Sequence, residues 1–350
     1  MLVKYYGLSF DEEKKTWSPR SDFIENGLFR MTQPKYLNDQ ASESRVHVYF
    51  NEFSPSDYEW AKKKHRINQL DPSYIPSKTE LETWCLKPVG SRYGDEFPHL
   101  LNQDGFSSME DFDKDQLIQI AEKINSFLVE VMSCHIGVFS LSKSEKNLHM
   151  WTHYAQEGRG LAVIFNETHP FFKQYKPKDI NYKSEKRVSL TYYKGSLRLD
   201  GSPLKNFRDY DLNSPYGVTQ LIQDNNIDTE TLSERLLYSK GEEWLNENEA
   251  RIICPLKSCE AHKDKIVDPD FGVELSEEEA EQFRHYEISL KKIPFDAIES
   301  IVLGYRMSEL DKVFIKEQVK KNEKLCHVKL RVAKLNVFGK VELTDYFNEL

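Results

Sequence analysis

The segment from residue 137 to residue 165 reads GVFSLSKSEKNLHMWTHYAQEGRGLAVIF and indicates the class of the fold. Its two ends, residues 137–141 and 160–165, are short apolar runs, which predicts two strands. They enclose an aromatic segment that includes Trp151 and Tyr154. Two strands therefore flank a dense group of functional side chains.

Further strands and helices are expected on both sides of this segment. Apolar runs predict strands at residues 2–6, 28–31, 249–256, 285–290, 300–304 and 326–335. Helical spacing or capping signals predict helices at residues 21–27, 54–68, 115–134, 229–240 and 308–322. Strands and helices do not alternate regularly, so the sequence predicts an α+β fold: a mixed, largely antiparallel sheet with flanking helices and helical insertions.

The 350 residues are interpreted as a single α+β domain over 1–350. Within it, residues 54–134 are predicted to form a helical insertion. A highly charged helix begins this region, and residues 70–105 are rich in Pro, Gly and aromatics without a clear period. Residues 115–134 then repeat apolar side chains at helical spacing, which predicts a core helix.

Charge and cysteine content exclude several classes of protein. A net charge of -9 argues against coating of nucleic acid by bulk electrostatics. No apolar run approaches the roughly 20 residues that cross a bilayer, so we expect a cytoplasmic protein without a membrane partner. The five cysteines are scattered, which predicts reduced thiols. Cys254 and Cys259 lack a second pair of ligands at zinc spacing, and no metal site is predicted.

A second group of polar side chains stands in the segment Trp244 to Arg251, WLNENEAR. If this segment is a strand, residues two apart share a face, so Glu247, Glu249 and Arg251 point the same way. Two carboxylates about 7 Å apart beside a guanidinium suit acid–base chemistry, because neighbouring charges move their pKa values apart. The alternative is a half-exposed strand whose charges are simply solvated.

The segment WTHYA offers aromatic side chains that could stack on a planar ring. In a helix, Trp151 and Tyr154 are three positions apart and meet on one side, with His153 beside them. The alternative is that both aromatics belong to the core and that His153 is a surface residue.

Five blocks in order resemble a bacterial family of unknown function, DUF2971: LVKYY, PKYLND, residues 139–165, KGEEWLNENEAR and IPFDAIESIVLGYR. The family pattern reads approximately K-Y, L-N-D-P-x-E, F-S, W-S-H-Y-A, G, K-x-x-x-W-x-x-E-x-E-x-R and I-x-x-I-x-L-G. The sequence departs from it at Gln40, where the family favours Pro, and at Thr152, where it favours Ser. Residues 54–105 are not covered.

The order of elements in that family looks like an ADP-ribosyltransferase fold, an analogy that implies NAD as substrate. It assigns Glu249 to stabilise positive charge on the ribose, Glu247 to orient or deprotonate an acceptor, and Tyr154 or Trp151 to stack the nicotinamide. Lys4 and Arg251 would meet the pyrophosphate. The remaining residues expected to bind NAD are Tyr5, Asn38, Asp39, His153 and Lys240. The first strand offers Lys4 and Tyr5 where such transferases usually show His or Arg.

Three hypotheses follow. The first is an ADP-ribosyltransferase-like enzyme, a toxin or an antiviral effector, acting on a protein or nucleic-acid acceptor. The second is a metal-dependent nucleic-acid-processing effector that uses Glu247 and Glu249. The third is a non-enzymatic binding module in which Lys240, Trp244 and Arg251 brace the structure. The acceptor and the oligomeric state are left open by the sequence.

Overall fold

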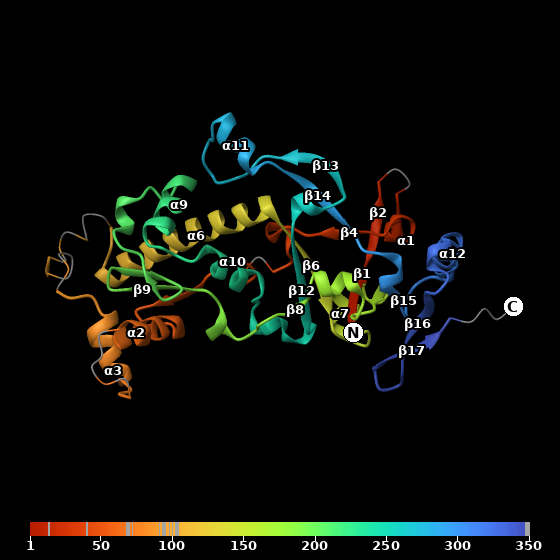
Figure 1. Ribbon diagram of the computed structural model, residues 1–350, viewed down its shortest axis with the longest axis horizontal. Helices are drawn as coiled ribbons and strands as arrows, with labels where there is room; N and C mark the ends of the chain where they lie inside the picture. The colour runs from red at the N-terminus through yellow and green to blue at the C-terminus, as the bar shows by residue number, and fades with distance from the viewer. Residues whose placement is uncertain are drawn as a thin grey trace.

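The computed structural model describes residues 1–12, 15–39, 41–67, 71, 73–90, 92, 96–97, 99, 101 and 105–346. Gln40, one of the two departures from the family pattern, lies outside these residues. Figure 1 shows an elongated molecule with α2 and α3 at one end and β15, β16, β17 and α12 at the other. Strands β1, β6 and β12 lie between the two ends.

An eight-stranded sheet runs through the molecule in the order β17-β16-β15-β7-β1-β6-β12-β8 (Figure 1). Its strands are β1 (Leu2–Tyr6), β6 (Ile136–Ser142), β7 (Leu161–Phe165), β8 (Lys178–Asp179), β12 (Glu249–Pro255), β15 (Ile298–Leu303), β16 (Lys329–Leu335) and β17 (Val341–Asp345). Neighbours are antiparallel except β15 and β16, which are parallel. The predicted α+β class with a mixed, largely antiparallel sheet is confirmed.

Three smaller sheets complete the β-structure. The first has the order β11-β10-β9-β5, the second β13-β14-β4, and β2 pairs with β3 alone. Their strands are β2 (Leu8–Asp11), β3 (Thr16–Pro19), β4 (Leu28–Met31), β5 (His47–Phe50), β9 (Ser189–Tyr193), β10 (Ser196–Leu199), β11 (Ser202–Pro203), β13 (Ala261–Val267) and β14 (His285–Lys292). A single bridge between Thr32 and Val138 ties the segment after β4 to β6.

The helices begin and end close to the signals in the sequence. α1 ends at Gly27, which has a φ of 71°. This backbone conformation is energetically unfavourable for residues that carry a Cβ. The helix expected over 115–134 extends to α6 (Met109–His135), and the Ser108 side chain caps its first turn. The other α-helices are α1 (Asp22–Asn26), α2 (Pro55–Ile67), α3 (Lys78–Leu81), α7 (Leu148–His153), α8 (Pro170–Gln174), α9 (Pro215–Asp224), α10 (Thr229–Leu237), α11 (Glu277–Phe283) and α12 (Glu309–Lys321). No helix in the described ranges is both long enough and apolar enough to cross a bilayer.

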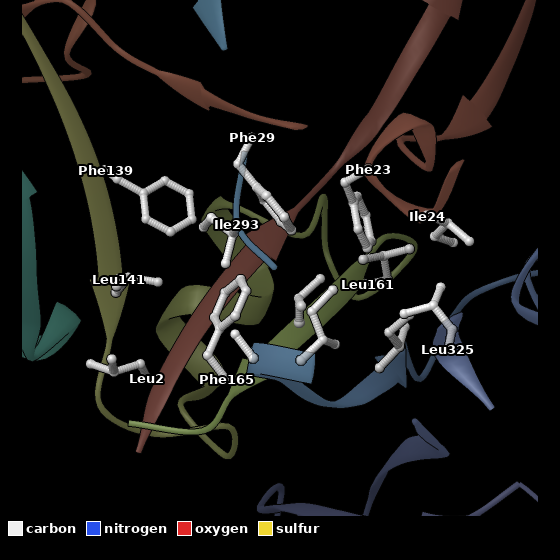
Figure 2. Packing of buried hydrophobic residues seen from close by; sticks show 14 of the residues in the cluster. Leu2, Phe23, Ile24, Phe29, Phe139, Leu141, Leu161, Phe165, Ile293 and Leu325 are labelled. Atoms are coloured by element: carbon white, nitrogen blue, oxygen red, sulfur yellow. The ribbon is translucent and has the colours of Figure 1, made fainter. Parts of the chain in front are cut away.

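Two large hydrophobic clusters hold the elements together. In Figure 2, Phe29, Phe139 and Phe165 meet at the centre of the first cluster, between the large sheet and β4. Each buried phenylalanine contributes about 1.5–3 kcal/mol by leaving water. The second cluster joins α6 to β9, β10, α9 and α10. Within residues 54–134, predicted as an insertion, α6 thus shares its core with residues 188–237, whereas Ala61, Leu81 and Leu86 form a separate small cluster.

The large sheet has a seam between β1 and β6. β1 pairs with β7 at all five of its residues, but the pairing with β6 is confined to Val3 and Ser142. Figure 2 shows β6, which carries Phe139 and Leu141, separating from β1 beyond that point. The two halves of the sheet are therefore joined at one position, and the space between them leads to the candidate site.

Candidate functional site

A cavity of about 880 Å³ lies along β1 and reaches into the seam. This volume falls in the range of small-molecule sites. Among the residues singled out from the sequence, those that line it are Lys4, Tyr5, Asn38, His153, Tyr154, Lys240, Glu247 and Glu249. Asp39, Trp151 and Arg251 do not line it. The exposed side chains of Trp17 and Arg20 mark its mouth, and the buried Lys240, Glu247 and Glu249 mark its inner end.

Lys240 stands at the centre of the inner end. Its ammonium nitrogen lies 2.7 Å from Glu247 Oε2, 3.3 Å from Glu43 Oε1 and 3.7 Å from Glu249 Oε2. It also sits 4.7 Å from the centre of the Trp244 ring, a cation–π contact. Burial would lower the pKa of Lys240, but the three carboxylates outweigh burial and raise it. Lys240 therefore stays charged and draws three acidic side chains to one point.

Arg251 lies behind this point and is completely buried. Its Nε donates to Glu249 Oε1 at 2.7 Å, its Nη1 donates to the carbonyl oxygen of Leu237 at 2.8 Å, and its Nη2 donates to Glu43. Burial would lower the pKa of the guanidinium, yet Glu249 and Glu43 raise it. Because no part of Arg251 reaches the cavity, it braces the two carboxylates from behind.

Glu43 was not singled out from the sequence. It belongs to a loop in which the Asp39 carboxylate accepts hydrogen bonds from the backbone amides of Ala41 and Ser42, and Glu43 Oε2 accepts one from the amide of Asp39. The buried side chain of Asp39 thus stabilises this loop and does not line the cavity. The family pattern L-N-D-P-x-E did contain a glutamate, and Glu43 stands one position beyond it.

Glu247 reaches the cavity by a different route from the one predicted. It ends the 3-10 helix η5 (Glu242–Glu247), and β12 begins only at Glu249, so a strand that holds Glu247, Glu249 and Arg251 on one face is wrong. Asn248 between them has φ 48°, in the left-handed region. This turn, together with a hydrogen bond from Ser142 Oγ to the Glu247 carbonyl oxygen at 2.9 Å, brings both carboxylates to Lys240.

Tyr154 closes the inner end from the side of α7. Its hydroxyl donates to Glu247 Oε1 across 2.5 Å. Burial and the neighbouring Glu247 raise the pKa of this phenol, so the hydroxyl keeps its proton at neutral pH. Tyr154 is half-buried and lines the cavity, as a residue that contacts a ligand must.

The two cavity carboxylates titrate in opposite directions. Burial raises the pKa of Glu247 by more than Lys240 and Tyr154 lower it. Burial also acts on Glu249, but there Arg251 and Lys240 outweigh it and lower the pKa to about 2. Glu249 is therefore a fixed negative charge, whereas Glu247 is the member of the pair that can take up a proton.

The other predicted residues have distinct places. Trp151 is fully buried, and its Nε1 donates to the Glu145 carbonyl oxygen at 2.9 Å. Trp151 therefore cannot stack on a ligand, and it supports Tyr5, whose ring lies 5.1 Å away edge-on. The Tyr5 hydroxyl donates to the carbonyl oxygen of Ser144. Asn38 and His153 are exposed at the cavity wall.

Lys4 bridges the seam of the sheet. Its Nζ donates to the Ser140 carbonyl oxygen on β6 at 3.0 Å and lies 5.0 Å from the centre of the Phe139 ring. Burial, with help from Arg20 and Arg251, lowers the pKa of Lys4 to about 8 despite the attraction of Glu249. Lys4 is thus a cation of the cavity wall whose pKa lies well below the usual value for lysine.

The part of the chain that the structure describes has no cluster of side chains suited to a metal ion. No three histidine, cysteine, aspartate or glutamate side chains there are placed to hold an ion. Glu43, Glu247 and Glu249 each contact Lys240. A divalent cation at this point would have to displace that ammonium group.

Comparison with known proteins identifies one family. Residues 150–252 match the model of a family described as protein of unknown function (DUF2971), which confirms the resemblance to this family. The matched segment contains KGEEWLNENEAR and part of residues 139–165, whereas the other three sequence blocks lie outside it. The matched segment carries Tyr154, Lys240, Glu247, Glu249 and Arg251, so it contains most of the inner end of the cavity. No curated protein and no solved structure is significantly similar to the chain.

Proposed function

We propose that this DUF2971 protein is an ADP-ribosyltransferase-like enzyme that binds NAD in the cavity and breaks the bond between nicotinamide and ribose. One observation carries the proposal. Glu247 and Glu249 lie at the inner end of a cavity of about 880 Å³, share Lys240 as a partner, and have pKa values shifted in opposite directions. Paired carboxylates with separated pKa values are typical of sites that transfer glycosyl groups.

Glu249 is suited to the charge that develops in this reaction. When the bond from ribose C1′ to the nicotinamide nitrogen breaks, both electrons leave with nicotinamide and positive charge remains on the ribose. A carboxylate that stays ionised stabilises this charge. Glu249 donates no proton and has acceptor capacity beyond its two hydrogen bonds from Arg251, so it can also accept one from a ribose hydroxyl.

Glu247 is suited to activate the acceptor. An acceptor oxygen or nitrogen forms the new bond to C1′ and must lose a proton as it does so. Glu247 can receive this proton because burial raises its pKa, which makes it a stronger base than an exposed glutamate. Tyr154 holds Oε1 of this carboxylate, and Lys240 holds Oε2. The group is therefore fixed in orientation before a substrate arrives.

Release of nicotinamide from NAD tests the proposal directly. We expect Glu249→Gln and Glu247→Gln to lower the rate by about 10²–10⁴-fold, the range for loss of a charge-stabilising or proton-accepting group. Glu309→Gln on α12, whose side chain is 78% exposed, is the matched control and should keep the rate. The proposal is abandoned if the unmodified protein releases no nicotinamide with water, protein extract or nucleic acid as acceptor.

One structural observation favours a second candidate, a non-enzymatic binding module. Arg251 is fully buried and pairs with Glu43 and Glu249, as the structural brace of that hypothesis requires. In this case Glu249→Gln lowers the melting temperature while ligand binding continues and no NAD is consumed. A thermal melt beside the nicotinamide assay separates the two candidates. The metal-dependent hypothesis is less well supported, because Lys240 already occupies the position between the carboxylates.

A further inference from the structure

Three cations of the cavity wall form no ion pair in the described part of the chain: Lys4, Arg20 and Arg30. They come from three separate elements, β1, the segment after β3, and β4. Lys35 also lines the cavity, but its ammonium nitrogen pairs with Glu130 at 2.9 Å. The three unpaired cations therefore stand apart from Lys240 and Arg251, which the inner carboxylates neutralise.

Arg30 has an unused donor inside the protein. Its Nε is buried and has no hydrogen-bond partner, although a buried N–H without an acceptor is costly. The guanidinium carbon lies 5.9 Å from the centre of the Tyr36 ring, which also lines the cavity. Arg30 is thus held against an aromatic wall of the cavity, and its buried Nε has no acceptor in the described part of the chain.

The charges of the three cations act on one another across the cavity that all three line. Burial lowers the pKa of Arg30, and Arg20 lowers it further. Burial likewise lowers the pKa of Lys4, to which both Arg20 and Arg30 contribute. Glu249 offsets part of this repulsion at Lys4, and Glu287 and Asp264 offset part of it at Arg30, but none of the three cations has a carboxylate within ion-pair distance in the described residues. A bound anion would lower the remaining repulsion.

We infer that Lys4, Arg20 and Arg30 form a subsite for the pyrophosphate bridge of a nucleotide. Arginine forks match phosphate oxygens in pairs, and a pyrophosphate bridge offers negative charge on two adjacent groups. Trp17 is 57% exposed at the mouth and Tyr36 lies beside Arg30, so flat aromatic surfaces for a base stand next to the cations. Arg251, which the analogy assigned to the pyrophosphate, is replaced in this role by Arg20 and Arg30.

The cavity is therefore polarised along its length. Glu247 and Glu249 lie at the buried end, and Arg20 is exposed at the mouth beside Trp17. Lys4 lies close enough to Glu249 for that carboxylate to raise its pKa. NAD has the complementary pattern, because its nicotinamide ring is positively charged and its pyrophosphate is negatively charged. The nicotinamide riboside accordingly points toward Glu247 and Glu249, and the adenosine points toward Trp17. This orientation rests on the proposed function, whereas binding of a pyrophosphate bridge does not.

Calorimetric titration with ADP-ribose tests the subsite, since this probe contains the bridge but no nicotinamide. We expect Arg20→Gln and Arg30→Gln each to weaken binding by about tenfold or more, as loss of a charge-assisted hydrogen bond does. Arg30→Lys keeps the charge and should recover part of the affinity. Arg66→Gln on α2 removes the same charge from an exposed position and should leave binding unchanged. Adenosine, which lacks phosphate, should bind weakly to all of these proteins.

The outcomes separate this inference from the proposed function. ADP-ribose binding that depends on Arg20 and Arg30, without release of nicotinamide from NAD, supports the subsite and contradicts the proposed enzymatic function. Release of nicotinamide with a KM that neither arginine variant alters supports the enzyme and overturns the subsite. Equal binding of ADP-ribose by the unmodified protein and by Arg20→Gln and Arg30→Gln, or no binding to any of them at low salt, also overturns the subsite.

Discussion

Tyr154 and Glu247 share a hydrogen bond of 2.5 Å across 93 residues of sequence. The bond ties α7 to the turn before β12 and fixes the carboxylate that we assign as the proton acceptor. Its other oxygen is bound by Lys240. The hydrogen bond between Tyr154 and Glu247 therefore affects both the position of the Glu247 carboxylate in the cavity and its affinity for a proton.

Tyr154→Phe should raise the pKa of Glu247 further. The phenol donates to the ionised carboxylate and so lowers that pKa, while burial continues to raise it when the hydroxyl is removed. A carbon-13 NMR titration of labelled glutamate, assigned with Glu247→Gln, measures the change. Tyr210→Phe removes an exposed hydroxyl bound to Asp224 and is the control. An unchanged or lowered pKa in Tyr154→Phe contradicts the assigned role of the bond.

Arg251→Met should destabilise the protein by about 3–5 kcal/mol. The substitution leaves Glu43 and Glu249 buried without their guanidinium partner. The resulting loss of folding free energy exceeds the gain from packing the methionine side chain. Denaturation by urea measures the free energy of unfolding. Arg159→Met, at a side chain that is 48% exposed, should change it by less than about 0.5 kcal/mol. A loss of similar size in both variants contradicts the brace.

Acid should remove a stabilising contribution of Glu249. Its pKa is about 2 in the folded protein against an ordinary value of 4.5, so the folded state binds the proton less tightly than the unfolded state. The contribution is present above about pH 4.5, and it is lost as the pH falls toward 2. Glu249→Gln should lack this part of the acid sensitivity. Unfolding curves of both proteins at several pH values test it, and parallel pH profiles contradict it.

Asn248 offers a test of the turn that brings the two carboxylates together. Its φ of 48° suits asparagine and glycine and strains a β-branched residue. Asn248→Val should therefore cost about 1–2 kcal/mol of stability and lower nicotinamide release, whereas Asn248→Gly should keep the rate. Melting curves and the NAD assay measure both effects. Equal behaviour of the two variants contradicts the importance of the turn.

Affinity for ADP-ribose should fall as the pH rises through about 8. Lys4 loses its charge in this range, and the bridge of ADP-ribose keeps its own charge. The charged groups that set the pKa of Lys4 are Glu249, Arg20, Arg251 and Arg30. Lys4→Met should bind more weakly below pH 8 and show a flatter profile from about pH 7 to about pH 9.5. If affinity for ADP-ribose changes with pH by the same amount in the unmodified protein and in Lys4→Met, Lys4 does not belong to the subsite.

Local signals in the sequence predicted much of the secondary structure. Gly27 ends α1 because glycine accepts a positive φ, and the apolar spacing of residues 115–134 predicted most of α6. Periodicity also placed Glu249 and Arg251 on one face of β12. It failed at Glu247, because a left-handed turn at Asn248 interrupts the strand pattern without an apolar signal.

Long-range contacts account for what the sequence missed. Glu43 meets Arg251 across 208 residues, and the only local signal for it, the glutamate of the family pattern, falls one position earlier in this sequence. Trp151 resembled a stacking platform, and only the packing of α7 against β1 shows that it is buried. Arg20 and Arg30 are individually ordinary, and only the folded structure shows that both line one cavity with Lys4.

The seam between β1 and β6 gives the sheet an unusual dependence on side chains. Where a continuous ladder would use a backbone amide, the Ser140 carbonyl oxygen receives the ammonium group of Lys4. A ligand bound between β1 and β6 would contact both halves of the sheet and connect them mechanically. Occupancy of the cavity would then set how stiffly β7, β15 and β16 are coupled to β6 and β12, and slower amide hydrogen exchange along the seam would report it.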